Sequence, residues 1–199
     1  MEINKIVDFN MDQNCYVITH NGSVLVIDPG SEKAVSGIEK ADAILLTHSH
    51  YDHTAGVPAL KKKTGATVIC TKECRENLKN ARLNVSVMFG ENMSLDCVDK
   101  TVSDGEEFKI GDILIKCIKT PGHTSCSTCY LTEDNLFSGD TIFLRTTGRW
   151  DLPTGDFSVL ENSIKNKIYT LDENLTVYPG HGEKTSVGYE KKFNMVIND

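Results

Sequence analysis

The 199-residue chain is long enough for one domain spanning residues 1–199, and its 39% hydrophobic and 25% charged residues are typical of a globular protein. Its net charge of −7 and the lack of a basic stripe argue against a nucleic-acid partner. The sequence shows no signal peptide and no long apolar run, so we expect a soluble cytoplasmic protein without a membrane partner. The oligomeric state is left open.

Strand and helix patterns are mixed along the first half of the chain. The Asn21-Gly22 dipeptide predicts a hairpin turn between two strands. Apolar alternation and short apolar runs predict strands over 3–9, 15–19, 23–28, 43–46, 66–70 and 96–102. Helical spacing predicts helices over 31–40, 54–63 and 71–79, and 83–93 is expected to form a loop.

The second half has the same mixed character. Strands are predicted over 107–110, 113–119, 127–131, 135–138 and 175–178, and helices over 157–169 and 187–195. The segment 141–156 shows no periodicity, and long irregular segments in small domains are usually functional or disordered. Taken alone, these patterns predict only a mixed α and β class.

Three of the six histidines lie in the segment T-H-S-H-Y-D-H at 47–53, between a predicted strand and a predicted helix. Residues two apart in extended backbone point to the same side, so His48 and His50 can bind one ion. The following turn then directs Asp52 and His53 towards a second ion. Imidazole and carboxylate ligands suit zinc, iron or manganese, so we predict a metal site here.

Three further residues are predicted to join this site. His123 and His181 lie in Pro-Gly-His turns that follow predicted strands, and Asp140 ends another predicted strand. His20 precedes the Asn21-Gly22 turn, and we expect it to be an exposed turn residue.

The order H-x-H-x-D-H, Gly-His, Gly-Asp and Gly-His resembles the metallo-β-lactamase superfamily over nearly the whole chain, from residue 24 to 181. The segments 139–141, 148–152 and 179–182 resemble its hydroxyacylglutathione hydrolase (glyoxalase II)-like branch. This resemblance implies an α+β fold, the four-layer αββα sandwich, with metals at one edge between two sheets.

The resemblance also implies two divalent ions, most readily zinc, with iron or manganese as alternatives. Asp52 and Asp140 are the predicted catalytic residues. A water held between the ions becomes hydroxide and attacks a carbonyl carbon. A thiolate leaving group needs little protonation, which favours thioester substrates. The implied ligands are His48, His50 and His123 for ion one, Asp52, His53 and His181 for ion two, and Asp140 as the bridge.

The resemblance further implies that Asp28 orients the ligand imidazoles, and Thr47 is expected to do similar work. An ordinary turn-capping role is the alternative for Asp28. Full hydroxyacylglutathione hydrolases carry a C-terminal helical extension that holds glutathione, and this sequence has no counterpart of it. The thiol carrier of the substrate is therefore left open.

Other members of the superfamily offer alternatives. Persulfide dioxygenases of this fold bind one iron through two histidines and an aspartate, which correspond to His48, His123 and Asp140. Two ions per chain would favour the hydrolase, and one iron with oxygen uptake the dioxygenase. An aspartate at 140, in place of a thiolate, argues against the main group of β-lactam hydrolases. A metal-binding protein without catalysis is the third class.

The irregular segment 141–156 follows Asp140 and is predicted to line the site. Arg145 and Arg149 would bind a substrate carboxylate, and Trp150 would form an apolar wall. On this reading Arg145→Ala raises KM for an anionic substrate about tenfold. The competing reading pairs Arg149 with a nearby aspartate and packs Trp150 in the core.

Seven cysteines and no secretory signal indicate free thiols. The spacing Cys126-x-x-Cys129 invites a redox reading. It lies in a predicted strand, however, where residues three apart face opposite sides, so we expect both to be buried thiols.

Overall fold

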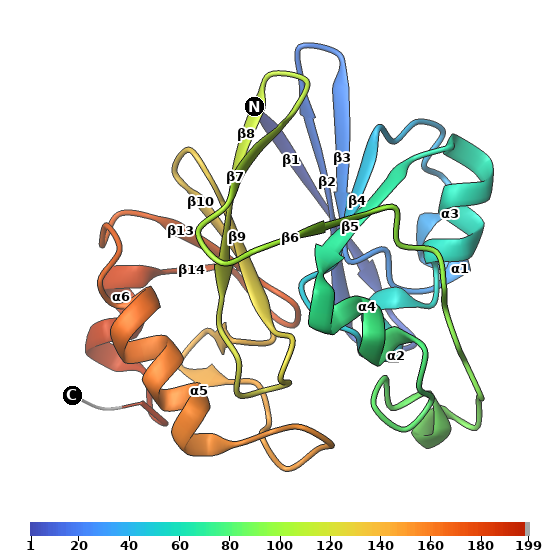
Figure 1. Ribbon diagram of the computed structural model, residues 1–199. Coiled ribbons are helices and arrows are strands. Elements are labelled where there is room, and N and C mark those ends of the chain that lie inside the picture. The colour runs from blue at the N-terminus through green and yellow to red at the C-terminus, as the bar shows by residue number, and fades with distance from the viewer. Residues whose placement is uncertain (198–199) are drawn as a thin grey trace.

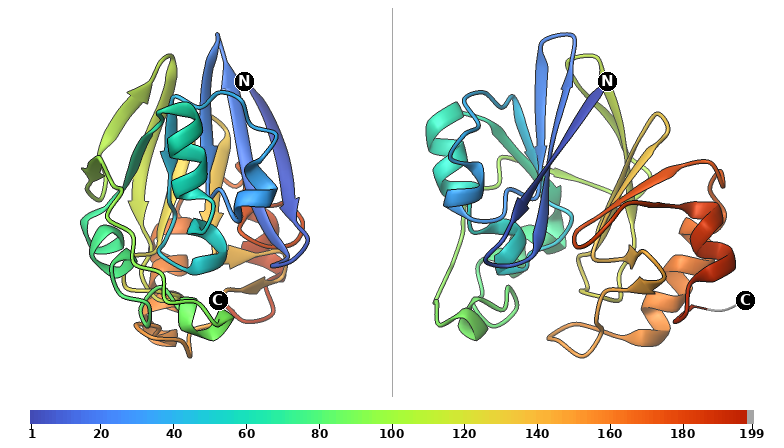
Figure 2. Two further views of the ribbon diagram at one scale, coloured as in Figure 1. Left: turned by 90° about the vertical axis from the view of Figure 1, so that its right-hand side faces the viewer. Right: turned by 180° about the vertical axis from the view of Figure 1, so that it is seen from behind.

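The computed structural model describes residues 1–197, and it has two sheets facing each other with helices on their outer faces (Figures 1 and 2). The predicted α+β four-layer αββα sandwich is confirmed. No helix in the described range is long and apolar enough to cross a membrane.

The first sheet is antiparallel at one side and parallel at the other. In spatial order its strands are β1 (Glu2–Asp8), β2 (Gln13–His20), β3 (Ser23–Ile27), β4 (Ala43–Leu45), β5 (Thr67–Thr71) and β6 (Lys100–Val102). Strands β3 to β6 pair in parallel. Parallel neighbours need long crossover connections, and these carry α1 (Glu32–Val35), α2 (Tyr51–Thr54), α3 (Val57–Thr64), α4 (Lys72–Leu78) and the 3-10 turn η1 (Ser86–Phe89).

The second sheet is antiparallel except where β13 pairs in parallel with β10. Its spatial order is β14 (Thr185–Ser186), β13 (Thr176–Pro179), β10 (Asn135–Gly139), β9 (Thr128–Thr132), β8 (Ile113–Lys119) and β7 (Glu107–Ile110). Its outer face is covered by α5 (Phe157–Ser163), the π-helical turn η2 (Ile164–Ile168) and α6 (Val187–Phe193). A separate hairpin, β11 (Ile142–Phe143) with β12 (Thr146–Thr147), follows β10.

The layer between the sheets is apolar and includes aromatic rings. Tyr16 of β2 meets Phe137 and Tyr178 of the opposite sheet edge-on, with ring centroids 5.4 and 5.5 Å apart. The Tyr16 hydroxyl donates to the carbonyl oxygen of Pro179 at 2.6 Å. This contact ties the first sheet to the end of β13, where one predicted metal ligand follows.

Several predicted elements differ in extent. The predicted helix at 54–63 begins earlier and is broken into α2 and α3 at Gly56, where a Cβ would lie 2.8 Å from the Pro29 carbonyl oxygen. The predicted helix at 31–40 is a single turn, and the predicted strand at 96–102 is shorter. All seven cysteines are free, and Cys126 precedes β9 instead of lying on it.

Candidate metal centre

The predicted ligands come together because four strands end at the same edge of the sandwich. The segment 47–53 follows β4, which pairs in parallel with β3 and β5. Asp140 follows β10, and His181 follows the parallel strand β13. His123 lies in the turn between β8 and β9. Parallel strands end on one side of a sheet, so side chains far apart in sequence converge there.

The first group consists of three buried imidazoles, those of His48, His50 and His123. Nε2 of His123 lies 3.3 Å from Nε2 of His48 and 3.0 Å from Nδ1 of His50. Two ligands that each lie about 2.1 Å from a tetrahedral zinc ion are about 3.4 Å apart. These separations therefore fit three ligands of one ion.

The second group consists of Asp52, His53 and His181. Nε2 of His181 lies 3.3 Å from Asp52 Oδ2 and 3.4 Å from Nε2 of His53. The third edge, from His53 Nε2 to Asp52 Oδ2, is 3.7 Å. This group also has the spacing of ligands around one ion, and it contains the carboxylate that the first group lacks.

Asp140 reaches both groups. Its Oδ1 lies 3.3 Å from Nε2 of His53, and its Oδ2 lies 3.6 Å from Nε2 of His123 and 3.5 Å from Nε2 of His181. Oδ1 is buried and accepts no hydrogen bond. A buried carboxylate oxygen without a donor is costly unless a cation compensates it. The residues present therefore fit metal ions, with Asp140 between them.

Hydrogen bonds fix which nitrogen of three ligand rings faces the site. Nδ1 donates in each case, so Nε2 is the nitrogen that can bind an ion. The acceptors are Asp28 Oδ2 for His53 at 2.9 Å, the Arg149 carbonyl oxygen for His123 at 2.6 Å, and the Asp12 carbonyl oxygen for His181 at 2.5 Å.

Asp28 supports the ligands from behind. It accepts hydrogen bonds from the Thr47 backbone N–H at 2.8 Å, from the Thr47 hydroxyl and from His53 Nδ1. Asp28 also lies close enough to His48 and His53 to share an ion with them. Three donors already occupy its carboxylate, and these contacts fit the role of orienting imidazoles that the resemblance implied for Asp28 and that was expected of Thr47.

The two groups differ in their proton affinity. Burial lowers the pKa of His48 well below its usual range and that of His50 to about 3, and neighbouring imidazoles add to both effects. Burial would also lower the pKa of His53, but Asp140, Asp52 and Asp28 outweigh it and raise that pKa well above its usual range. The first group is therefore a set of neutral imidazoles, whereas the second is a network of opposite charges.

Two residues that the sequence did not single out hold the turn carrying His181. Asn14 donates its backbone N–H to the Gly180 carbonyl oxygen at 2.7 Å. Its side-chain amide donates to the carbonyl oxygens of Pro179 and Gly182 at 3.0 and 2.9 Å. Tyr16 shares the Pro179 acceptor. Asn14 lies just before the strand predicted at 15–19, so no strand pattern in the sequence marked it.

Glycine is required at 180. A Cβ there would lie 2.2 Å from Asp140 Oδ1 and 2.6 Å from Cε1 of His53. The close approach of the backbone lets the turn pass directly beside the bridging carboxylate, so that His181 can follow it into the second group.

A cavity of about 480 Å³ opens onto the ligands. Its walls add residues from three segments, 85–89, 143 and 149–152, to the metal-binding side chains. The lining residues are His50, Asp52, Val85, Met88, Phe89, His123, Asp140, Phe143, Arg149, Leu152 and His181. Its size fits a small-molecule substrate.

The structure places two of the three predicted substrate residues outside the cavity lining. Arg145 does not line the cavity, and its guanidinium contacts Met195 Sδ at 3.7 Å. Buried Glu190 of α6 accepts a hydrogen bond from the Arg145 backbone N–H at 2.8 Å. This bond holds the β11–β12 hairpin on α6. Trp150 is also outside the lining and packs on Phe157 with ring centroids 4.8 Å apart. Neither position supports the expected contact with substrate.

Arg149 does line the cavity, but its guanidinium makes two hydrogen bonds of 2.7 Å to Asp151. This is the competing arrangement considered from the sequence.

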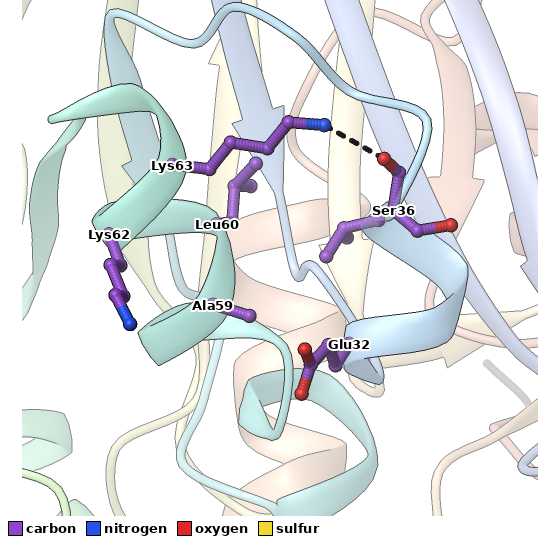
Figure 3. A pocket seen from close by; sticks show the side chains of 7 residues that line it. Glu32, Ser36, Ala59, Leu60, Lys62 and Lys63 are labelled. Atoms are coloured by element: carbon purple, nitrogen blue, oxygen red, sulfur yellow. Dashed lines mark hydrogen bonds between the residues drawn. The ribbon is translucent and has the colours of Figure 1, made fainter.

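A second cavity of about 440 Å³ lies between α1 and α3 (Figure 3). Lys63 at its rim donates to the Ser36 carbonyl oxygen at 2.9 Å and to Glu39 at 2.7 Å. None of its lining residues belongs to the metal ligands, so this cavity is separate from the chemistry.

Two facing sheets with histidine and aspartate clusters at one edge are the arrangement of the metallo-hydrolase fold. The sequence pattern of the metallo-beta-lactamase superfamily matches residues 10–181, and the chain belongs to this superfamily.

Curated relatives cover nearly the full length of the chain. The chain is 34% identical to a probable metallo-hydrolase of Methanocaldococcus jannaschii, over 95% of this chain and 98% of that protein. It is 30% identical to the hydroxyacylglutathione hydrolase GloC of Haemophilus influenzae, over 94% of this chain and 93% of that protein.

Solved structures agree on the fold. The BLEG-1 B3 metallo-beta-lactamase superposes with a TM-score of 0.91 at 30% identity, covering 100% of both chains. ETHE1 from Myxococcus xanthus gives 0.82 at 27% identity, over 99% of this chain and 84% of that one. TTHA1623 in a di-iron-bound form gives 0.85 at 26% identity, over 96% and 98%.

Proposed function

We propose that this protein is a hydrolase of thioesters that uses two divalent metal ions and resembles hydroxyacylglutathione hydrolases. The observation that carries this proposal is the position of Asp140, whose two oxygens lie 3.3 Å from His53 in the second group and 3.6 Å from His123 in the first. A single-ion site needs no carboxylate that spans two ligand sets.

The bound ions would supply an acidified water as nucleophile and polarise the scissile carbonyl. The protein's own part is to hold the ligands in place. Asp28 and the Arg149 carbonyl fix the tautomers of His53 and His123, so that each presents an unprotonated nitrogen. Asp140 and Asp52 bring negative charge to the cavity floor, which balances the charge of the cations. A thiolate product leaves without a dedicated proton donor.

Zinc is the ion we propose first, since nitrogen and oxygen ligands at tetrahedral spacing suit it. The same ligands suit iron or manganese. The di-iron form of a relative with a TM-score of 0.85 supports iron as the principal alternative.

The second candidate is a dioxygenase of persulfides with one iron. His48, His123 and Asp140 would form its two-histidine, one-carboxylate set, with Nε2 of His123 lying 3.3 Å from His48 Nε2 and 3.6 Å from Asp140 Oδ2. This arrangement would leave Asp52, His53 and His181 without an ion.

The test combines metal analysis with a substrate screen. Protein prepared without chelators is analysed for zinc, iron and manganese, and then assayed with thioesters, simple esters, glutathione persulfide and, because one similar structure is a B3 metallo-beta-lactamase, a β-lactam. About two ions per chain and thiol release without oxygen uptake are expected. One tightly bound iron with oxygen uptake on persulfide would favour the second candidate.

A further inference from the structure

One wall of the metal cavity is apolar although it is open to solvent. Val85, Met88 and Phe89 line it beside His50 and Asp52. Met88 is 62% exposed and Phe89 is 48% exposed. Exposed apolar side chains that gather at the rim of a ligand cavity mark a binding surface.

The segment that carries this wall is held firmly. Buried Asn84 donates to the carbonyl oxygens of Leu78 at 3.1 Å and Met93 at 2.8 Å, and it accepts from the Ser86 backbone N–H at 3.0 Å. Its own carbonyl oxygen accepts from the backbone N–H of Tyr51, which lies between two metal ligands, at 2.8 Å. The wall is thereby fixed to the metal-binding turn, so the exposure of Met88 and Phe89 is built into the fold.

Two further features point to a functional surface. Val85 adopts a φ of 56°, which is unfavourable for a β-branched residue, and such strained positions cluster at binding sites. The Phe89 ring lies over that of Tyr51, with centroids 5.1 Å apart, so one of its faces is already supported. A substrate would need to cover only the other side.

Two other lining residues are also apolar. They are Phe143, whose ring centroid lies 5.9 Å from that of His181, and Leu152. Among the described residues that line the cavity, Arg149 is the one lysine or arginine, and Asp151 already binds its guanidinium. The cavity therefore presents metal ligands at its floor and apolar side chains above them, without an unpaired cation for a carboxylate-bearing group.

We propose that the preferred substrates are thioesters whose acyl group is apolar, either a medium-length aliphatic chain or an aromatic ring, and that Met88 and Phe89 determine this specificity. The proposal rests on the thioester hydrolase function above and names its substrate class. With the carbonyl at the metals, the acyl group would lie against the wall formed by Val85, Met88 and Phe89.

The test measures kcat/KM for acetyl, butyryl and hexanoyl thioesters of N-acetylcysteamine with the metal-loaded protein. From acetyl to hexanoyl we expect a rise of about tenfold, because a fully buried methylene gives roughly fourfold and this open cavity covers only part of the chain. Met88→Ala and Phe89→Ala should each flatten the series.

The matched control is Met195→Ala. Met195 is 64% exposed, close to the 62% of Met88, but it lies outside the cavity. It should keep the full dependence on chain length, and all variants should keep the same metal content. Equal rates across the series, or a dependence that survives both Met88→Ala and Phe89→Ala, would overturn the specificity proposal while leaving thioester hydrolysis intact.

Failure of the proposed function would look different, since no thioester would then be hydrolysed. In that case calorimetric binding of acetate, butyrate and hexanoate decides whether the wall binds apolar chains. Tighter binding with chain length that Met88→Ala removes and Met195→Ala retains supports the wall as an apolar subsite. Equal affinities for the three carboxylates would rule it out.

Discussion

The two ligand groups are built on opposite electrostatic principles. His48, His50 and His123 are each at most 3% exposed, and burial keeps their pKa values low. In the second group the side chains of Asp52 and His181 are 15% and 25% exposed, and carboxylates raise the pKa of His53 and His181 although burial opposes this. The side chains of the first site are buried and neutral, whereas those of the second are partly exposed and charged.

Because of this difference, the two groups have different requirements for binding an ion. Neutral buried imidazoles need lose no proton to bind an ion, so the first group is prepared for metal by burial alone. The second group has its carboxylate within the cavity and depends on outside support, from Asp28 behind His53 and Asn14 behind the His181 turn. Asp140 connects the two sites, so its removal tests the comparison most severely.

Asp140→Ala should produce the largest effect. It removes the one ligand that reaches both groups and leaves His53 and His123 without their shared carboxylate. We expect the pair of ions to be lost, with metal content falling from about two ions per chain to one or fewer, and thioester hydrolysis to be lost. Elemental analysis after gel filtration provides the measurement. Asp134→Ala, at an exposed turn residue, should bind as much metal as the wild type.

Single substitutions within each group should separate the sites. His50→Ala should lose ion one and His53→Ala should lose ion two, so each variant keeps about one ion per chain. In each variant the group without the substitution keeps all three of its ligands, and Asp140 is also still present. Metal stoichiometry, with visible spectroscopy of the cobalt-substituted forms, would distinguish the two. Equal loss of both ions from either variant would contradict this partition of ligands.

Asp28→Asn should weaken ion two by roughly 10- to 100-fold, as other supporting residues of metal ligands do. The carboxamide has similar size but only one acceptor oxygen, so it cannot satisfy both Thr47 and Nδ1 of His53. Competition with a chromophoric chelator measures the affinity of each ion. If the affinity for ion one fell as much as that for ion two, Asp28 would stabilise the whole ligand loop and would not act on His53 in particular.

Asn14→Ala should have a moderate effect. It removes two hydrogen bonds to the turn that carries His181, one buried and one partly buried, each worth about 0.5–1.5 kcal/mol. Tyr16 still donates to the Pro179 carbonyl oxygen and Lys5 to that of Gly182, so neither acceptor is left unpaired. We expect lower thermal stability and severalfold weaker binding of ion two. Asn194→Ala is the matched control, because buried Asn194 also donates two amide hydrogen bonds, to the Thr146 carbonyl oxygen and to Glu190. It should lose stability without loss of ion two; equal metal affinities in both variants would limit Asn14 to a structural role.

Local patterns predicted strand ends, a mixed α and β class and a metal site at H-x-H-x-D-H, because these are short-range signals. The four-layer sandwich and the division of the ligands between two ions came from the family resemblance. Long-range contacts were not visible. Asn14 acts on a turn that lies more than 160 residues later, and no local pattern announces that pairing. Arg145 was assigned to the site because it follows Asp140 closely, but Glu190, 45 residues later, anchors its hairpin on α6. Proximity in sequence to a ligand did not determine where the hairpin docks.

The smallest effect is predicted for Arg149→Ala, which tests the role of the Arg149 side chain apart from that of its backbone carbonyl. Its guanidinium pairs with exposed Asp151, whereas its carbonyl oxygen accepts from Nδ1 of His123 at 2.6 Å. Arg149→Ala keeps that carbonyl, and exposed ion pairs contribute little, so metal content should be unchanged. We also expect KM for an apolar thioester to change by less than about threefold, well below the tenfold expected of an arginine that binds substrate. A tenfold rise in KM with full metal content would instead indicate that the guanidinium binds substrate. Its ion pair with Asp151 would then have to break when substrate binds.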